Sequence, residues 1–509
     1  MQIAVILDPA RLRRWHVWLL GELAARLRHD LAARGRQKLA VRFVPSPPPH
    51  MPAALELLLR LERLTGRVHG PSALDPIPAS DPAFAQTSQF DTPGALTIDL
   101  RGLATPAIEG VLQPLYDGSA DERALWLALL CGRAPVVSVG GGGMPSPIPS
   151  ALPAPEDPLN LTSAATMTFA RVAEATALVA ADIAAGRAPL TRLAAASSGT
   201  PRNGSALSFA SALIAGKARR ILDRRLATTP KWTVAYRAAT TGRTHPPRGL
   251  DVRSFKRLAD DGQRFYADPF VFEHQGQVHL FVEELPFATG RGIISHSVLG
   301  ADGRFTPPRP ILERPYHLSY PQVFARDGHI WMMPEASASG AIELYRADPF
   351  PDRFVLHARL VEGAFHDATL FEHDDRLWIA AGNQRVGSST WDGLSLLHAH
   401  SLDGPWTPHA RNPVLVDGRS ARPAGELYRA GGHLWRPSQD CTGGYGSALT
   451  LSRIDDLTPE TFSETPVTTL RLAGPRGLSG PHTINFSSNA CDAIEVIDAF
   501  APPQWDPQR

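Results

Sequence analysis

Four carboxylates in the C-terminal half of the chain occupy equivalent places in a repeated pattern and are the side chains best suited to chemistry. They are Asp268, Glu335, Asp367 and Asp440. One carboxylate of a pair can move a proton while the other activates an acceptor or stabilises positive charge, as making or breaking a glycosidic bond requires. We therefore predict that these four residues are the catalytic groups of a carbohydrate site.

Polar and aromatic side chains around these carboxylates are candidates for holding a sugar. Carboxylate and amide oxygens accept hydrogen bonds from hydroxyl groups, arginine grips carboxylates or phosphates through its fork, and tyrosine can stack on a sugar face. Some of these residues have structural alternatives, since Arg422 or Arg436 could form a buried ion pair with Asp440 and Tyr445 could pack a loop. The predicted substrate-binding residues are Glu283, Tyr320, His366, Arg422, Glu426, Arg436, Gln439, Tyr445 and His482.

A repeated hairpin must position these residues. Residues 266–284 have the pattern of a strand, a tight turn at His274–Gly276 and a second antiparallel strand. The pattern returns four times with a period of about 50 residues, which is typical of β-propeller blades with four short strands. The aromatic anchors of the five copies are Phe272, Phe324, Phe371, Tyr428 and Phe486. The start of the first strand and the end of the second then meet at one rim, so the candidate residues should converge at the mouth of the central channel.

The N-terminal half alternates strands with helices, which predicts a Rossmann-like α/β domain with a mostly parallel sheet. Gly140–Gly143 follows a strand and could offer backbone N–H groups to a phosphate, although a plain loop is the simpler interpretation without a G-x-G-x-x-G pattern. The fold class is therefore α/β plus all-β, with an α/β domain at 1–225 and a five-bladed β-propeller at 232–500. The expected strands are 2–7, 39–44, 95–100 and 135–139, and the expected helices are 10–34, 52–65, 122–131, 164–186 and 205–226.

Composition limits the classes of function. Among 509 residues, 51 Lys and Arg balance 50 Asp and Glu for a net charge of +1, which gives no sign of a nucleic-acid or membrane-surface binder. Three cysteines without short spacing argue against a disulfide framework or a zinc site and suit a reducing compartment. With neither a signal-peptide pattern nor an apolar run long enough for a transmembrane segment, we expect a cytoplasmic protein. No cofactor is expected, although His, Asp and Glu at the mouth could hold a divalent cation.

Three motifs of the propeller half resemble a known family. H-L-S-Y-P-Q-V-F at 317–324, M-M-P-E at 332–335, and R-P-S-Q-D at 436–440 followed by Tyr445–Gly446 resemble the N-terminal domain of plant glucosamine inositolphosphorylceramide glycosyltransferases. The resemblance covers roughly residues 230–500. The plant proteins also carry a membrane-linked transferase domain that this sequence lacks, so the resemblance does not by itself transfer their activity.

Two weaker resemblances add expectations. The A-D-P that includes Asp268 and the H-D-A that includes Asp367 look like five-bladed propeller glycosidases of the arabinanase and β-xylosidase type. That resemblance implies that Asp268 is the base, that Asp367 orients and tunes the acid, and that a Glu opening the fourth blade donates the proton. Here Arg422–Ala424 occupies that opening and Glu426 falls inside the strand, so Glu335 becomes a second candidate donor. The N-terminal half weakly resembles the formyltransferase-like α/β domain, without its H-x-S-L-L-P motif, which implies a fold and not formyl transfer.

Three hypotheses for the function remain open. The first is an enzyme of the glycosyltransferase type that makes a glycosidic bond in glycan or glycolipid assembly from a sugar or nucleotide-sugar substrate. The second is a glycoside hydrolase of the five-bladed propeller type, and the third is a non-catalytic sugar-binding propeller. The expected cytoplasmic location favours transfer, because activated sugar donors are cytoplasmic whereas polymer hydrolases are usually exported. The sequence carries no signal for the oligomeric state.

Overall fold

The chain folds into two compact units. One contains Met1–Arg219 together with Arg385–Ser389, and the other contains Arg220–Gln384 together with Thr390–Arg509. The computed structural model describes residues 2–34, 38–47, 53–64, 70–85, 96–103, 108–142, 144, 146–193, 205–225, 231–238, 247, 249–473, 479–487 and 493–501. Within this described part of the chain, no helix combines the length and the apolar character that a bilayer span requires.

The N-terminal unit is built on a six-stranded mixed sheet with the strand order β2-β1-β3-β4-β5-β6. The first four strands in this order run parallel, whereas β5 is antiparallel to β4 and to β6. The strands are β1 (Gln2–Leu7), β2 (Lys38–Phe43), β3 (Leu96–Asp99), β4 (Val111–Tyr116), β5 (Val137–Gly141) and β6 (Ile148–Ala151). The unit therefore has the α/β character that the sequence predicts, but its sheet contains both parallel and antiparallel strand pairs.

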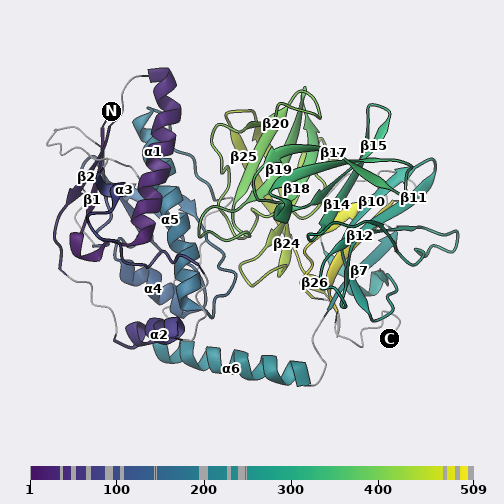
Figure 1. Cartoon of the computed structure of the whole chain (residues 1–509), viewed down its shortest axis with the longest axis horizontal. Coiled ribbons are helices and arrows are strands. Elements are labelled where there is room, and N and C mark those ends of the chain that lie inside the picture. Colours follow the sequence, from purple (N-terminus) through teal and green to yellow (C-terminus); the bar gives the residue numbers. More distant parts are fainter. Residues whose placement is uncertain are drawn as a thin grey trace. The chain divides into compact units, whose positions relative to one another are not determined.

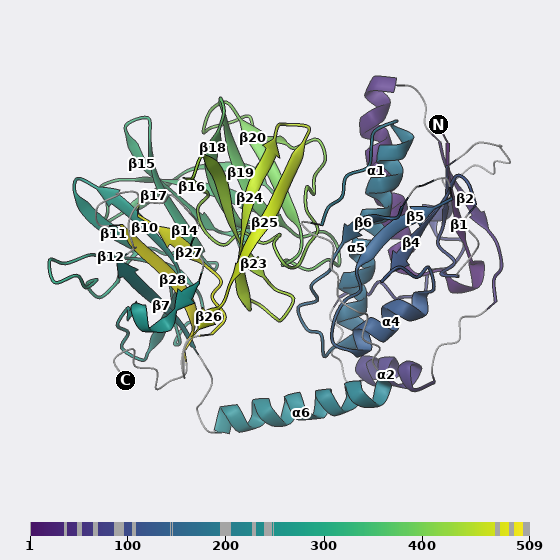
Figure 2. The ribbon, with the colours of Figure 1, turned by 180° about the vertical axis from the view of Figure 1, so that it is seen from behind.

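Helices of this unit form where the apolar spacing of the sequence predicts them. In α1 (Arg14–Arg34) the buried residues Trp15, Leu19, Leu23 and Leu27 recur every four positions, which makes one apolar stripe. The almost wholly buried α5 (Leu161–Ala184) packs along the sheet and against α1 (Figures 1 and 2). The other helices are α2 (Ala53–Leu64), α3 (Pro82–Ala85), α4 (Glu122–Leu130) and α6 (Ala206–Arg225).

Two expectations for this unit need correction. The sequence did not predict β4 and β6, because Pro114 and Pro149 interrupt them and proline is unusual inside a sheet. Gly140 and Gly141 belong to the antiparallel strand β5 and not to a loop after a parallel strand. A Cβ at Gly141 would lie 1.9 Å from the Val111 carbonyl oxygen, so glycine permits close strand packing there; Gly143 lies outside the described residues. The finer Rossmann-like and formyltransferase-like assignments stay predictions.

The second unit contains five four-stranded sheets, as the repeat predicted, and forms a five-bladed β-propeller (Figure 1). Blade 1 is β10 (Arg264–His274), β11 (Gln277–Pro286), β12 (Ile293–Val298) and β13 (Arg309–Leu312). Blade 2 is β14 (Ser319–Arg326), β15 (His329–Glu335), β16 (Ala341–Ala347) and β17 (Phe354–Glu362). Blade 3 is β18 (Phe365–His373), β19 (Arg376–Asn383), β20 (Leu394–Ala399) and β21 (Thr407–Pro408). Blade 4 is β22 (Tyr428–Ala430), β23 (His433–Asp440), β24 (Ala448–Leu457) and β25 (Phe462–Leu470).

Blade 5 closes the ring with strands from both ends of the unit. It is ordered β27 (Ile484–Phe486), β28 (Ile494–Ala501), β7 (Lys231–Ala238) and β9 (Lys256–Arg257). The early strand β7 pairs antiparallel with the late strand β28 over its whole length, which closes the ring of blades and leaves no unpaired strand edge where the two ends of the unit meet. A two-stranded ribbon of β8 (Leu250–Asp251) and β26 (Leu472–Ala473) accompanies the closure.

Apolar seams between adjacent blades hold the propeller together. Val234 of blade 5 packs with Val271 of blade 1, and Phe281 of blade 1 lies in one cluster with Met332 of blade 2. Comparable clusters join blades 2 and 3 and blades 4 and 5. Because each seam fixes the rotation of one blade against the next, side chains at equivalent places are presented to the same channel mouth.

Candidate active site at the propeller mouth

The residues that open the first three blades share an unusual backbone conformation. Asp268, Tyr320 and Asp367 have φ angles of 48°, 47° and 50°. At each of them the first strand changes its pairing register, so each is part of a β-bulge. Left-handed φ at a residue other than glycine costs about 1–3 kcal/mol and tends to cluster at functional sites. The repeated strain turns these three side chains out of the regular alternation of the strands.

Asp268 lies at the centre of the first cluster. Thr483 donates its hydroxyl to Asp268 Oδ1 over 2.7 Å, and the Tyr320 N–H donates to Oδ2 over 3.2 Å. His482 Nε2 lies 3.1 Å from Oδ1. Burial by itself raises the pKa of the Asp268 carboxyl, but the His482 charge and these hydrogen bonds outweigh burial and lower it. Asp268 is therefore a buried anion.

His482 bridges two buried carboxylates. Its Nδ1 lies 2.8 Å from Asp498 Oδ2 and its Nε2 faces Asp268. Burial lowers the pKa of His482, but the charges of Asp498 and Asp268 raise it to about 10, so the ring is an imidazolium at neutral pH. The ligand atoms of the three residues lie within 4.8 Å of one another, as a divalent cation would require. A metal binds the neutral imidazole, so a divalent cation here would have to displace the ring proton of His482.

Asp367 is the second carboxylate at a blade opening and has a different environment. Arg422 of the segment before blade 4 donates from Nε to Asp367 Oδ2 over 2.7 Å, and Gln439 Nε2 donates over 3.4 Å. Burial raises the pKa of Asp367 to about 6; Arg422 opposes this rise, and the charges of Asp268 and Glu335 add to it. Asp367 can therefore carry a proton near pH 6, whereas Asp268 is ionised in the resting site and free to act as a base.

Two further carboxylates pair with histidines of the next blade. Glu283 Oε1 lies 3.3 Å from His317 Nε2, and Glu335 Oε1 lies 3.6 Å from His366 Nδ1. Burial raises the pKa of Glu283 in spite of His317, with the Asp268 charge adding to the rise. Burial also raises the pKa of Glu335, but His366 and the two hydrogen bonds from Ser337 outweigh it and lower the pKa. Glu283 is thus better placed than Glu335 to carry a proton.

An aromatic wall stands beside these charges. The Tyr445 ring lies 5.7 Å from Trp391, 6.1 Å from Trp232 and 5.1 Å from His482, measured between centroids. The Arg422 guanidinium lies 5.2 Å from the centre of the Tyr445 ring. Such a wall next to hydrogen-bonding carboxylates suits the apolar face of a sugar ring. Sequence reasoning identified Tyr445 but missed Trp232, Trp391 and His317, which lie outside the two strands of the hairpin repeat.

The remaining candidates have other contacts. Tyr320 is fully buried, and its hydroxyl contacts Thr369 and accepts from the Gly425 N–H, so it joins blades 2, 3 and 4. Glu426 receives a 3.5 Å contact from Gln322 Nε2, and Gln322 is two positions along its strand from Tyr320. The Glu426 N–H donates to Asn485. The side-chain contact of Glu426 is therefore with Gln322 of β14, a residue further along that strand than the blade-opening Tyr320.

Arg436 and Asp440 do not pair with each other. Arg436 is buried and donates to both carboxylate oxygens of Glu464 over 2.8 and 2.6 Å, which fits the structural ion pair raised as an alternative, but with a different partner. Asp440 accepts from the Thr442 hydroxyl over 2.6 Å and lies 3.4 Å from Arg471. Of the two arginines, Arg422 is the one whose contacts lead to the mouth.

Comparison with known proteins agrees with the motif resemblance. Residues 255–477 match the family model described as Glucosamine inositolphosphorylceramide transferase 1, N-terminal. Curated relatives with the name Glucosamine inositolphosphorylceramide transferase 1 are 35% identical over 209 residues in Oryza sativa subsp. japonica and 33% identical over 207 residues in Arabidopsis thaliana. Each alignment covers 40% of this chain, but only 28% and 27% of the respective relatives. The predicted family resemblance of the propeller is confirmed for that segment.

Solved structures with similarity to this chain include glycoside hydrolases. The arabinohexaose complex of Cellvibrio cellulosa alpha-L-arabinanase has a TM-score of 0.31 and 14% identity, covering 40% of this chain and 78% of that one. The sucrose-6-phosphate hydrolase of Lactobacillus gasseri has a TM-score of 0.36 and 14% identity, covering 44% of this chain and 52% of that one. Similarities of this size give no information about activity.

Proposed function

We propose that the propeller mouth is the active site of a carbohydrate-active enzyme of the glycosyltransferase type, which makes a glycosidic bond in glycan or glycolipid assembly. The observation that carries the proposal is the contrast between Asp268 and Asp367. Both open a blade from a strained bulge, yet the pKa of Asp268 is lowered and that of Asp367 is raised to about 6. Titratable groups whose environments push their pKa values apart are the usual sign of separate acid and base roles.

The proposed chemistry assigns a role to each charge. Asp268 accepts the proton of the acceptor hydroxyl while that oxygen attacks the anomeric carbon. The bond from the anomeric carbon to the leaving group breaks, and the positive charge of Arg422 balances the negative charge that develops on a leaving phosphate. Asp367 holds Arg422 in place through the 2.7 Å hydrogen bond and, with its raised pKa, is the acid of the pair that can give a proton to the leaving phosphate. The sugar ring rests on Tyr445 and Trp391.

Transfer is the preferred reaction for two reasons. The curated relatives that match the propeller are named transferases, although the match covers less than a third of their length. A guanidinium also occupies the opening of blade 4, and a fixed positive charge suits a phosphate leaving group better than the protonated alkoxide leaving group of a hydrolase. We keep the domain limits at 1–225 and 232–500 and the cytoplasmic location as parts of this proposal.

Hydrolysis is the second candidate, and one observation favours it. The raised pKa values of Asp367 and Glu283 provide proton donors for a glycosidic oxygen even without a glutamate at the opening of blade 4. Donor and base would then come from neighbouring positions of the same mouth. A sugar-binding propeller without catalysis is the third possibility, and the same experiment addresses it.

The test is a panel of nucleotide sugars and oligosaccharides, each with and without an acceptor glycan or glycolipid headgroup. A transferase consumes a nucleotide sugar faster when an acceptor is present and yields a larger glycan. Release of free sugar from an oligosaccharide without any acceptor supports hydrolysis instead. Binding that a crystal soak locates against Tyr445 and Asp268, with no turnover of any compound, leaves only the binding function.

A further inference from the structure

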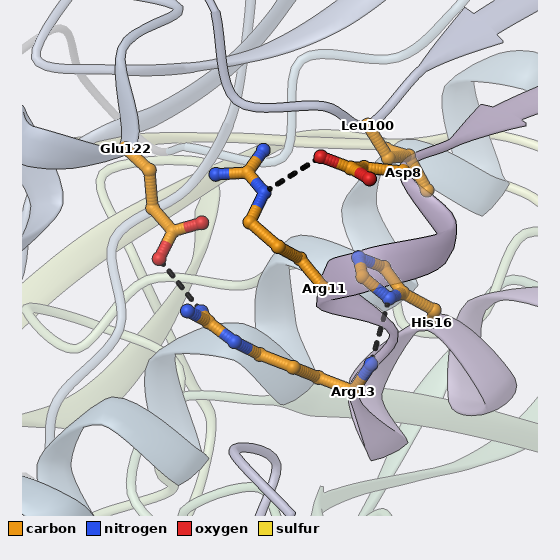
Figure 3. Close-up of a pocket in the computed structure, with 6 residues that line it drawn as sticks. All are labelled: Asp8, Arg11, Arg13, His16, Leu100 and Glu122. Carbon is orange, nitrogen blue, oxygen red and sulfur yellow. Dashed lines mark hydrogen bonds and ion pairs between the residues drawn. The ribbon is translucent and has the colours of Figure 1, made fainter. Parts of the chain in front are cut away.

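A separate pocket lies in the N-terminal unit at the carboxyl ends of its parallel strands. Asp8 directly follows β1, Leu100 directly follows β3, and Glu122 opens α4, the helix that follows β4. In the strand order β2-β1-β3-β4, the strand that follows β1 in sequence lies on one side of β1 and the next strand, β3, lies on its other side. The topological switch point therefore falls between β1 and β3. Ligands of open α/β sheets bind in the crevice at such a point. Arg11, Arg13 and His16 complete the lining (Figure 3).

His16 presents one ring nitrogen to this pocket. Its Nδ1 accepts the Arg13 N–H over 3.1 Å, which satisfies a backbone donor before the first turn of α1. Burial lowers the pKa of His16 to about 3, and the charges of Arg13 and Arg11 contribute, so the ring is neutral. Because Nδ1 accepts, the single proton sits on Nε2, which points to the side of the pocket where Asp8 lies (Figure 3). His16 is only 5% exposed, and the hydrogen bond that its ring forms within the described part of the chain is the one at Nδ1.

The guanidinium groups of Arg11 and Arg13 lie beside His16, and each has N–H donors that form no hydrogen bond with the described residues. Arg11 donates from Nε to Asp8 over 3.2 Å and from Nη2 to the Arg101 carbonyl, which leaves Nη1. Arg13 donates from Nη1 to Glu122 over 2.7 Å, which leaves Nε and Nη2 within the described part of the unit. The Arg11 and Arg13 side chains are only 17% and 21% exposed, and each forms an ion pair with a carboxylate. Burial and these ion pairs together hold both guanidinium groups in place at the pocket.

The two carboxylates of the pocket differ in how many hydrogen bonds they already accept. Asp8 accepts from the Ala10 N–H and from the Ser46 hydroxyl in addition to Arg11. Glu122 Oε1 accepts from Arg13 and from Trp126 Nε1, while Oε2 has no hydrogen-bond partner among the described residues. The pocket therefore offers four donor nitrogens from three side chains and one acceptor at its border.

We propose that this pocket binds the phosphoryl group of a small phosphate ester that carries a hydroxyl group, the chemistry of a sugar phosphate. The three equatorial oxygens of a phosphoryl group match donors on Arg11, Arg13 and His16, whereas a carboxylate would leave one of them unused. A hydroxyl of the same ligand donates to Glu122 Oε2. The site is distinct from the propeller mouth, and it stands or falls independently of the proposed transfer reaction.

The test is calorimetric titration of the full chain at pH 7 and low salt with glucose 1-phosphate, inorganic phosphate, glucose and acetate. We expect saturable binding of glucose 1-phosphate, weaker binding of phosphate, and no heat from glucose or acetate at this site. His16→Asn keeps an acceptor for the Arg13 N–H but removes the donor on Nε2. Because a hydrogen bond to a charged group is lost, it should weaken binding by about tenfold or more. Arg11→Gln should do the same, and both variants are checked for folding by thermal denaturation.

Two control variants distinguish binding in this pocket from binding elsewhere on the chain. Arg14→Gln removes the same charge three residues further along the chain than Arg11→Gln. Arg14 pairs with Asp75 and does not line the pocket, so the variant should bind the ligand with wild-type affinity. Arg422→Met alters the propeller mouth, so any heat that this variant removes belongs to binding at the mouth and not to this pocket. The proposal is overturned if the wild type shows no saturable binding, if folded His16→Asn and Arg11→Gln both bind normally, or if only Arg422→Met loses the ligand.

Discussion

The guanidinium of Arg422 donates from Nε to Asp367 Oδ2 over 2.7 Å and thereby links the opening of blade 4 to the opening of blade 3. The same arginine lies 5.2 Å from the Tyr445 ring centre and donates from Nη1 to Thr390. Both partners are buried, so the pair is weakly screened by solvent. One residue thus couples the protonation of a candidate catalytic carboxylate to the aromatic wall that would hold a sugar.

Removing this arginine should change the pH dependence of turnover. Arg422 opposes the rise in the pKa of Asp367, so Arg422→Met should push that pKa from about 6 to a higher value. The limb of the kcat/KM profile that reports Asp367 should move up by about one pH unit or more, and Arg422→Lys should give a smaller shift. The measurement is a pH–rate profile from pH 5 to pH 9.

Arg419→Met is the matched control for that experiment. Arg419 lies three residues earlier and pairs with Asp417 at 2.7 Å, so its loss removes a charge nearby without touching Asp367. An unchanged profile in Arg422→Met, or an equal shift in Arg419→Met, would contradict the assigned role of Arg422.

Asp268→Asn should abolish most of the turnover and leave the fold intact. The change keeps the size of the side chain and removes the charge that makes Asp268 a base, and general acid–base catalysis contributes about 10²–10⁴-fold. The loss should appear in kcat rather than in binding. Asp327→Asn is a suitable control, because Asp327 also has a left-handed φ of 51° but stands in the hairpin turn between β14 and β15. Full activity in Asp268→Asn would remove this residue from the mechanism.

His482 should make the stability of the propeller depend on pH. The folded protein binds its proton more tightly than the unfolded chain, because the pKa rises from 6.5 to about 10 beside Asp498 and Asp268. The stabilisation is therefore fully present below about pH 6.5 and is lost as the pH rises through about 10. We expect the free energy of unfolding to fall by a few kcal/mol over this range. Urea denaturation at several pH values measures it, and His482→Gln should show a flatter curve than the wild type.

Arg436 should affect stability and not the mouth. Replacing one partner of a buried ion pair leaves an uncompensated charge, so Arg436→Met should cost about 3–5 kcal/mol of unfolding free energy. The double variant Arg436→Met with Glu464→Leu should recover much of this loss. Arg453→Met removes an exposed partner of Asp455 and should cost less than about 1 kcal/mol. Urea denaturation of the four proteins tests the prediction, and a double variant as unstable as Arg436→Met would refute it.

The repeat made much of the propeller predictable. Anchors such as Phe272 and Phe371 recur at the period of a blade, and a strand period of two fixes which residues share a rim. This reasoning brought Asp268 and His482 to one place, where they lie 3.1 Å apart. Arg436 could have been separated from the mouth by the same rule, because it stands three residues from Gln439 in β23 and so lies on the opposite face of the strand.

Other features depend on segments that the repeat does not describe. The contact of Arg422 with Asp367 depends on the path of the chain before β22, which carries no strand pattern. His317 and Trp391 also come from connections between strands, so no period points to them. In the N-terminal unit, Pro114 and Pro149 concealed two strands whose pairing is decided by neighbouring strands and not by local propensity. The left-handed φ of Asp268 is decided by tertiary packing, because aspartate tolerates this region but residue type does not say which aspartates adopt it.

The last prediction concerns the proton donor that the hydrolysis alternative requires, for which the sequence left Glu335 and Glu426 as candidates. The structure adds Glu283, whose pKa is raised by burial and by Asp268, whereas the pKa of Glu335 is lowered despite burial by His366 and Ser337. A donor must hold its proton near the working pH, so Glu283→Gln should reduce kcat by about 10²-fold or more while Glu335→Gln costs less. Glu426→Gln should cost least, because Glu426 contacts Gln322, which lies further along its strand than the blade-opening Tyr320.

Each glutamine is isosteric, so thermal denaturation should show three folded proteins and the comparison rests on rate alone. A substrate with a good leaving group sharpens the test, because it needs no proton and should restore turnover only in the variant that lacks the donor. Rescue of Glu283→Gln supports Glu283 as the proton donor, the role that its raised pKa indicates. Rescue of Glu335→Gln would show that substrate binding reverses the order of the two pKa values. A severe and rescued loss in Glu426→Gln would restore the ordinary glycosidase arrangement and make hydrolysis the better proposal.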